Sequence, residues 1–147
     1  MNLEFREMHE SDFSACAKVL MAAFKDEPWN ENWTYEQAYR RVGDIMSIRV
    51  SKGYVACDGK EVVAMALGHM VYCPDWSQLY IDELSVHPNY QSKKIGSKLL
   101  DYVRKELKKD DVRYIILNTQ VGFSAANFYE KNGFEKLDNV MMMSIKV

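Results

Sequence analysis

The chain has 147 residues, of which 48% are hydrophobic, and this size and composition predict one domain over residues 1–147 with its own apolar core. Its 19 Lys and Arg residues against 21 Asp and Glu residues give a formal charge of −2, without the basic excess that binding to nucleic-acid phosphates requires. No stretch approaches the roughly 18 apolar residues of a membrane span, and the acidic N-terminus is unlike a signal peptide. We therefore expect a soluble, cytoplasmic protein with neither a nucleic-acid nor a membrane partner.

The cysteines give no sign of a disulfide framework or a metal site. They are three in number, Cys16, Cys57 and Cys73, and they show neither CxxC nor Cys/His spacing. We expect buried thiols in a reducing compartment and no metal cofactor.

The N-terminal third predicts a strand, a helix and an aromatic loop. Alternating apolar residues indicate a short strand at residues 3–8. The following helix can be capped by Ser11 or Asp12, and Pro28 is expected to end it. The sequence DEPWNENW, which follows that helix, is typical of a loop.

The middle of the chain predicts a second helix and an antiparallel hairpin. Thr34 followed three residues later by Gln37 is a capping-box pattern, so a helix should begin there. Two strands, at residues 54–57 and 62–73, are joined by Asp58-Gly59, a dipeptide favoured in tight hairpin turns.

The next strand, in the stretch QLYIDELSVHP, changes the phase of its apolar residues. Leu79 and Ile81 occupy odd positions, whereas Leu84 and Val86 occupy even ones. A bulge at Asp82-Glu83 would place both pairs on one face and leave backbone groups unpaired, so a ligand with amides could bind there as a pseudo-strand. The alternative is a strand buried on both faces, which needs no bulge. This pattern alone leaves both interpretations open.

The stretch HPNYQSKKIGSKLL joins that strand to a helix predicted from Gly96 to Lys108. A helix start offers unpaired N–H groups and the positive end of the helix dipole, to which Lys93 and Lys94 add charge. The motif therefore predicts an anion site, in which Gly96 lets a phosphate approach the backbone. An ordinary solvated helix start is the alternative, and the nucleotide patterns GxxxxGK[ST] and GxGxxG are absent.

The position of the motif in the fold favours the anion site. A strand at residues 113–119 completes a strand-helix-strand unit, which makes the two strands parallel and places the motif at the carboxyl end of the first one. A short helix should follow, with Ser124 as its cap and Gly133 as its terminator. We expect a last strand pair to end in MMMSIKV.

Two motifs carry a resemblance to the GNAT superfamily of N-acetyltransferases, over nearly the whole chain. Residues 91–96, QSKKIG, resemble the family's Q/R-x-x-G-x-G/A loop, with Lys94 where the family usually has its first glycine. Residues 128–134, FYEKNGF, match the family's FYEKxGF. The resemblance implies an α/β (α+β) GNAT fold, a mixed central sheet with a bulged, splayed parallel strand pair flanked by helices.

The resemblance also implies acetyl-CoA as cosubstrate, and it allows a homodimer. The pantetheine arm is expected along the bulged strand, the pyrophosphate on the loop amides, and an additional contact from the residue before the second motif. The corresponding coenzyme-binding residues are Leu84, Ser85, Val86, Gln91, Ser92, Lys93, Lys94, Ile95, Gly96, Ser97 and Asn127.

Acetyl transfer needs a base for the amine and an acid for the departing thiolate. The resemblance assigns the acid to Tyr129 and implies direct transfer, although an aromatic residue on a helix can simply pack. Asp82 is the first candidate for the base and Glu83 the second, with a solvated surface pair as the alternative. His9, His69 and His87 have no partner visible in the sequence, so we expect them to be structural.

The acceptor site is expected in the loop after the first helix, because the resemblance places it there. Its carboxylates and aromatic side chains, Asp26, Glu27, Trp29 and Trp33, suit a small cationic amine of the aminoglycoside or polyamine kind. The stretch EPWNxxW also resembles members grouped with aminoglycoside 6'-N-acetyltransferases. Alternatively, the two Trp residues hold the loop on the core. A protein or peptide N-acetyltransferase and a non-catalytic acyl-CoA-binding module remain the other candidate functions.

Overall fold

The computed structural model describes residues 1–147 and contains a five-stranded sheet in the order β1-β2-β3-β4-β5. The first four strands are antiparallel and β5 runs parallel to β4, which confirms the predicted α+β fold with a mixed sheet. The strands are β1 (Leu3–Glu7), β2 (Ser51–Asp58), β3 (Glu61–Tyr72), β4 (Ser77–Val86) and β5 (Tyr114–Ile116).

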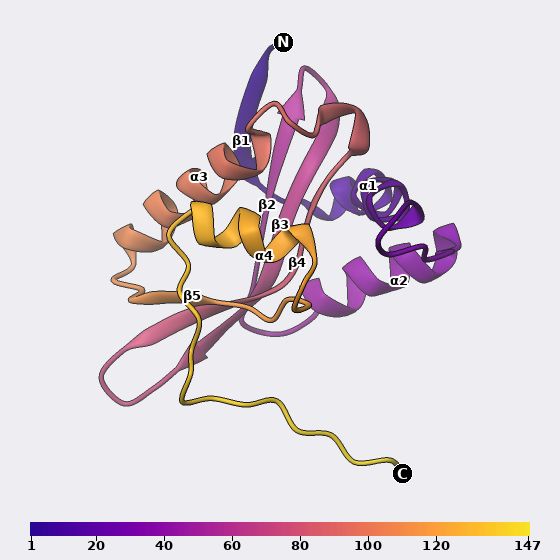
Figure 1. Ribbon diagram of the computed structural model, residues 1–147. Helices are drawn as coiled ribbons and strands as arrows, with labels where there is room; N and C mark the ends of the chain where they lie inside the picture. Colours follow the sequence, from indigo (N-terminus) through magenta and orange to yellow (C-terminus); the bar gives the residue numbers. More distant parts are fainter.

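Four α-helices cover the two faces of this sheet (Figure 1). They are α1 (Phe13–Lys25), α2 (Tyr35–Met46), α3 (Ile95–Lys109) and α4 (Ser124–Lys131), with 3₁₀ turns η1 (Glu10–Asp12) and η2 (Pro88–Tyr90). None of the helices has the length and apolar character needed to cross a membrane.

Several local signals have the structures that they predict. The Thr34 hydroxyl accepts from the Gln37 N–H at 3.1 Å and the Gln37 side chain accepts from the Thr34 N–H at 2.9 Å, which is the expected capping box of α2. Gly133 follows α4 with a φ of 91°, a left-handed conformation that glycine adopts without strain. Gly59 likewise has a φ of 60° in the turn between β2 and β3.

The start of α1 differs from the prediction. Asp12 precedes the helix, but its carboxylate does not cap it. Instead it accepts two hydrogen bonds from the Arg6 guanidinium, at 2.7 and 3.0 Å, and one from the His9 N–H at 2.7 Å. The hydrogen bonds from Arg6 are the main reason why the pKa of Asp12 is lowered. The helix then ends at Lys25, before Pro28 is reached.

Two apolar clusters, one on each face of the sheet, form the core. The first packs α1 and α2 against β2 and β3, and the second packs α3 against β2, β3 and β4. All three cysteines are free; Cys16 and Cys57 are buried as expected, but Cys73 is only half-buried because it lies at the outer end of the β3–β4 hairpin.

A bulge interrupts the pairing of β3 with β4. Leu67 pairs with Glu83 and Gly68 with Ile81, so Asp82 has no residue opposite. This is the predicted bulge, and it excludes the alternative of a regular strand buried on both faces. Its geometry requires a glycine at position 68, because a Cβ atom there would lie 1.8 Å from the Tyr80 carbonyl oxygen.

Beyond the bulge, β4 has no partner on the side of β5. The parallel pairing joins Gln78–Tyr80 to Tyr114–Ile116 and then stops. The predicted strand at residues 113–119 is therefore shorter than expected. Along the last six residues of β4, Ile81–Val86, the only neighbouring strand is β3. The two parallel strands thus separate towards the loop at residues 87–94.

The segment after α4 forms no strand, so the prediction of a last strand pair ending in MMMSIKV is wrong. An edge of three residues, which is all that β5 provides, offers few backbone groups for pairing. Figure 1 shows the segment running away from the sheet. Its apolar side chains are exposed: Met141, Met142, Met143, Ile145 and Val147.

Candidate active site

The N-terminus of α3 lies at the carboxyl end of β4. Its first N–H groups have no intrahelical acceptor, and no side chain caps them. Lys94 precedes the helix with a φ of 61°, and Ser92 has a φ of 63°. The loop therefore has a left-handed turn at the position where the family usually has glycine, and the peptide amides of the turn remain available for an anion.

The loop before α3 is attached to its surroundings at both ends. The Gln91 amide donates to the Val86 carbonyl at 3.2 Å, and the Lys93 ammonium lies 5.2 Å from the centre of the Tyr90 ring. Tyr90 in turn donates to Asp58 at 3.2 Å. These contacts hold a loop whose side chains from Gln91 to Lys94 are exposed.

Gly96 has a packing role that the sequence did not reveal. It is buried, and a Cβ atom there would lie 3.0 Å from the Phe128 ring and 3.4 Å from Val86. The absence of a side chain at this position lets α4 approach α3. Ile95 is also buried, whereas Ser97 is half-buried and Asn127 on α4 is exposed.

The unpaired edge of β4 adds a second polar feature. Residues from Leu84 to Val86 pair only with β3, so one side of their backbone has no strand beside it. Ser85 is 4% exposed and its hydroxyl has no hydrogen-bond partner. Such an edge can pair with an extended ligand that carries amides.

Tyr129 lies on α4 between two aromatic rings. Its ring centre is 5.3 Å from that of Phe128 and 5.4 Å from that of Phe134. Burial raises the pKa of Tyr129 to about 12, and the negative charge of Glu83 adds to this rise. The phenol therefore keeps its proton near neutral pH and can act as an acid, while its ring also packs.

Glu83 extends from the bulge to α2. Its carboxylate is 14% exposed and accepts from the Arg41 Nε at 3.1 Å. Burial raises the pKa of Glu83, and the positive charge of Arg41 opposes that rise. Arg41 was not identified from the sequence, because a basic residue on the polar side of a helix has no local signal of its partner.

Asp82, the extra residue of the bulge, pairs with a histidine. The His69 Nδ1 lies 2.8 Å from the Asp82 Oδ2, so His69 has a partner that was not visible in the sequence. The bulge offset brings these two residues together from neighbouring strands. His87 accepts from the Asn89 N–H at 3.2 Å as a turn residue, and His9 precedes η1.

The loop between α1 and α2 is held by aromatic contacts. The Trp29 ring centre lies 5.2 Å from that of Phe24 and 5.0 Å from that of Phe123, both edge-on. This supports the interpretation that Trp29 holds the loop on the core. Its role in acceptor binding, like that of the exposed Asp26 and Glu27, stays a prediction.

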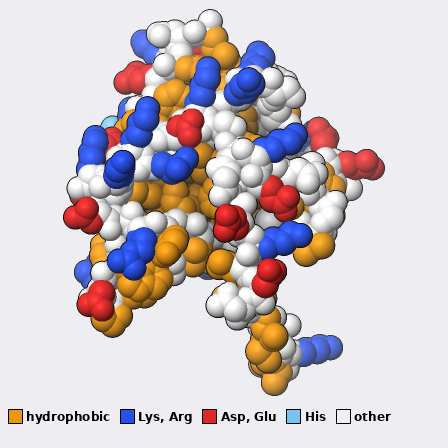
Figure 2. Space-filling view, turned by 60° about the vertical axis from the view of Figure 1, so that its left-hand side comes forward, with side chains coloured by type: hydrophobic (Ala, Val, Ile, Leu, Met, Phe, Trp, Pro, Cys, Tyr) orange, Lys and Arg blue, Asp and Glu red, His pale blue; other side chains and the backbone are white.

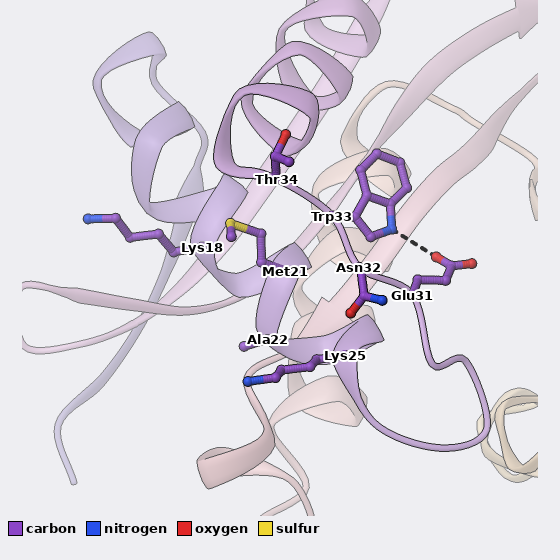
Figure 3. A pocket seen from close by; sticks show the side chains of 8 residues that line it. All are labelled: Lys18, Met21, Ala22, Lys25, Glu31, Asn32, Trp33 and Thr34. Atoms are coloured by element: carbon purple, nitrogen blue, oxygen red, sulfur yellow. Dashed lines mark hydrogen bonds between the residues drawn. The ribbon is translucent and has the colours of Figure 1, made fainter.

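Trp33 and Glu31 line an open groove of about 570 Å³ beside α1 (Figure 3). The Trp33 Nε1–H donates to the Glu31 carboxylate at 2.8 Å. Lys18 and Lys25 also line the groove, whereas Asp82, Glu83 and Tyr129 do not. It is therefore separate from the cluster at the bulge, although the charge of Glu31 contributes to the raised pKa of Glu83.

The surface seen in Figure 2 has apolar side chains gathered in a hollow that Lys and Arg side chains border. No group of three or more His, Cys, Asp or Glu side chains lies close enough together to hold a metal ion.

Residues 50–136, more than half of the chain, match the model of the acetyltransferase (GNAT) domain. The chain belongs to the GNAT acetyltransferase family. A search of curated proteins gave no match.

Solved structures share the fold of this GNAT acetyltransferase at low identity. A possible acetyltransferase from Clostridium difficile 630 is 20% identical with a TM-score of 0.84, over 100% of this chain and 99% of that one. An aminoglycoside acetyltransferase, meta-AAC0020, from an uncultured soil metagenomic sample, in complex with sisomicin, is 16% identical with a TM-score of 0.75, over 99% and 96%. The ribosomal-protein-alanine N-acetyltransferase of Brucella melitensis biovar Abortus 2308 is 14% identical with a TM-score of 0.75, over 99% of each chain.

Membership of this family implies that acetyl-CoA is the acetyl donor. The site fits such a molecule in two respects. The uncapped start of α3 suits a diphosphate, and the unpaired edge at Leu84–Val86, with the unpartnered Ser85 hydroxyl, suits the amides of a pantetheine arm.

Proposed function

We propose that residues 1–147 act as one N-acetyltransferase domain that transfers the acetyl group of acetyl-CoA directly to a primary amine of a small, cationic acceptor of the aminoglycoside or polyamine kind. The observation that carries this proposal is that the bulge carries Asp82 and Glu83, and that the charge of Glu83 acts on the half-buried phenol of Tyr129. A pure coenzyme-binding module needs the loop before α3 but none of these three side chains.

We assign the coenzyme contacts to the residues that the resemblance gives for them. The diphosphate binds the amides of the loop at residues 91–97, with Lys93 and Lys94 adding positive charge. The pantetheine arm pairs with the edge of β4 at Leu84–Val86, and Asn127 contacts it from α4. This arrangement directs the thioester towards the gap between β4 and β5.

Different side chains of the protein take the proton from the amine and give a proton to the thiolate. The carboxylates of Asp82 and Glu83 attract an ammonium group, and Asp82 lies on the path by which its proton leaves. Tyr129 donates its proton to the departing thiolate. Because its pKa is about 12, this phenol is protonated throughout the neutral range and needs no other acid to prepare it.

The charge of the loop between α1 and α2 supports this acceptor class. Asp26, Glu27 and Glu31 belong to the loop between α1 and α2, and the charge of Glu31 reaches Glu83. These loop carboxylates would attract a polyvalent cation, against the opposing charges of Lys18 and Lys25 in the groove at Glu31. The resemblance of EPWNxxW to the aminoglycoside 6'-N-acetyltransferase group supports the same class.

A panel of acceptors tests the proposal. Aminoglycosides, polyamines, amino acids and peptides are each incubated with acetyl-CoA, and release of free thiol is measured. We expect turnover with a small polyamine or aminoglycoside. Turnover with peptides alone would instead identify a protein N-acetyltransferase, and coenzyme binding without any turnover would favour the binding module.

Tyr129→Phe tests the acid on the acceptor so identified. The change should lower kcat by about 10²- to 10⁴-fold, the usual contribution of general acid catalysis, while coenzyme affinity and thermal stability stay near the wild-type values. The ring is kept, so the aromatic packing with Phe128 and Phe134 is controlled. Full activity of a folded variant, with chemistry limiting the rate, would remove Tyr129 from the mechanism.

A further inference from the structure

His69 and Asp82 form a pair that the mechanism above leaves unexplained. His69 lies on β3 and Asp82 on the bulge of β4, with 2.8 Å between Nδ1 and Oδ2. The side chains are 28% and 19% exposed, so the pair is shielded but open to a small molecule.

The neighbours of His69 fix the orientation of its ring. His69 pairs across the strands with Tyr80, and the two ring centres lie 5.4 Å apart at an angle of 32°. The Tyr80 hydroxyl is hydrogen-bonded to the Asn118 side chain beyond β5, so Tyr80 is itself held. One face of the imidazole is therefore covered, and one of its nitrogens is bound to Asp82.

The hydrogen bond also determines which nitrogen carries the proton. A carboxylate can only accept, so Nδ1 of His69 must be the donor to Asp82. In a neutral imidazole the other nitrogen, Nε2, then has a free lone pair. This is the tautomer that a base needs.

We propose that His69 is the base of the acetyl transfer, and that Asp82 is a positioning residue that orients its ring and stabilises the imidazolium. This inference rests on the proposed transfer to an amine. An N–H bond of the acceptor ammonium breaks as an N–H bond forms at Nε2, and the freed lone pair of the amine forms the N–C bond to the thioester carbonyl. The C–S bond then breaks and the thiolate takes the Tyr129 proton. A second proton of the attacking nitrogen passes through water to the Tyr129 phenolate, and the imidazolium releases its proton to water. No electron transfer is involved.

The other charges around the bulge are consistent with this assignment. Glu83 on the same strand is paired with Arg41 of α2. Arg41 therefore does not compete with His69 for the carboxylate of Asp82. Tyr129 of α4 keeps its proton because burial raises its pKa to about 12. Imidazole is the side chain that exchanges its proton near neutral pH, and this matches the requirement for an efficient base.

The first arm of the test compares variants at the two positions, with the acceptor found in the panel. His69→Asn can keep a donor towards Asp82 but has no base, so kcat/KM should fall by about 10²- to 10⁴-fold and the acidic limb of its pH profile should disappear. Asp82→Asn keeps the imidazole, so its kcat/KM should fall by less. A folded His69→Asn protein with near wild-type kcat/KM, or Asp82→Asn as the more damaging change, would overturn the proposal and make Asp82 the base.

The second arm needs no acceptor. Nitrogen-15 NMR of the imidazole should show Nδ1–H in the wild type, because the Asp82 carboxylate can only accept. An Nε2–H tautomer would overturn the pair. If the panel gives no turnover but the NMR result is as expected, the proposed function fails while the geometry of the pair stands; the opposite outcome rejects only the pair.

Discussion

The two halves of β4 differ although they belong to one strand. Residues Ser77–Tyr80 come before the bulge and have strands on both sides, with β5 beside Gln78–Tyr80. Residues Ile81–Val86 have β3 on one side only. The first half contributes the fully buried Leu79, whereas the second half carries Asp82, Glu83 and the unpartnered Ser85 hydroxyl.

This difference shows how one bulge separates stability from function. Before the bulge, the backbone groups of β4 are satisfied by its neighbours and the side chains complete the core. After it, one edge of the strand has no partner and polar side chains come together. Burying their charges is unfavourable, as the raised pKa of Glu83 shows. Functional sites commonly carry such unfavourable features, and the rest of the fold compensates for them.

The largest effect is expected from Gly68→Ala, which attacks the bulge directly. The new Cβ would lie 1.8 Å from the Tyr80 carbonyl oxygen, so a strand must move. We expect a loss of about 3 kcal/mol or more in the free energy of unfolding, measured by urea denaturation. Gly43→Ala in α2 is the matched control: nothing lies within 4 Å of its new Cβ, so stability should rise by up to about 1 kcal/mol. Wild-type stability of Gly68→Ala would show that the register at the bulge is wrong.

Two leucines compare the halves of β4 more closely. Leu79 is 2% exposed and lies before the bulge, so Leu79→Ala should cost about 3 kcal/mol. Leu84 lies after the bulge and is only half-buried, so its surroundings can relax and its side chain is already partly solvated. Leu84→Ala should therefore lower the free energy of unfolding by about half as much. The same urea titrations measure both. Equal losses would mean that the second half of β4 is as well packed as the first.

The sequence revealed the features of β4 that depend on local pattern. The change of apolar phase between Ile81 and Leu84 indicated the bulge as one of two interpretations, because side chains alternate along a strand, and the resemblance to the family favoured it. The left-handed turn at Lys94 could be inferred only from the glycine that the family usually has there.

The contacts of the site could not be predicted, because they join residues far apart in the chain. The pairing of His69 with Asp82 depends on the offset that the bulge adds between two strands, and Arg41 reaches Glu83 only after α2 packs on the sheet. The interpretation of the C-terminal MMMSIKV as a strand failed for a related reason. A strand needs an edge to pair with, and β5 provides three residues.

Arg41→Met should make stability more dependent on pH. The pKa of Glu83 is raised in the folded protein, so the native state holds this proton more tightly than the unfolded chain does. Stability associated with Glu83 is therefore present at acid pH and is lost as pH rises from the ordinary carboxyl range through the native pKa. Removing Arg41 raises that pKa further, and the loss at neutral pH should be about 1–2 kcal/mol.

Urea midpoints between pH 4 and pH 8 measure this effect. Glu83→Gln serves as the control, because it removes the titrating group: its stability should vary less with pH, and adding Arg41→Met to it should cost little more. If Arg41→Met lowers the free energy of unfolding by the same amount at every pH, the Arg41 side chain stabilises the fold through packing alone.

The smallest effect concerns the loop that follows the second half of β4. Lys94 has a φ of 61°, a conformation that costs a non-glycine residue about 1–2 kcal/mol, whereas glycine adopts it freely. Glycine also gives the unfolded chain more conformational entropy, which lowers stability by about 0.5–1 kcal/mol and offsets part of this gain. Lys94→Gly should therefore raise the free energy of unfolding by about 0.5–1 kcal/mol. Lys98→Gly, at an exposed position inside α3, is the matched control and should lower it by about 1 kcal/mol.

If the loop binds the diphosphate mainly through its amides, the Kd for coenzyme A in Lys94→Gly should rise by no more than about fivefold, since an exposed charge contributes about 1 kcal/mol or less. Calorimetry measures this Kd, and a much larger rise would assign the binding to the lysine charge rather than to the turn.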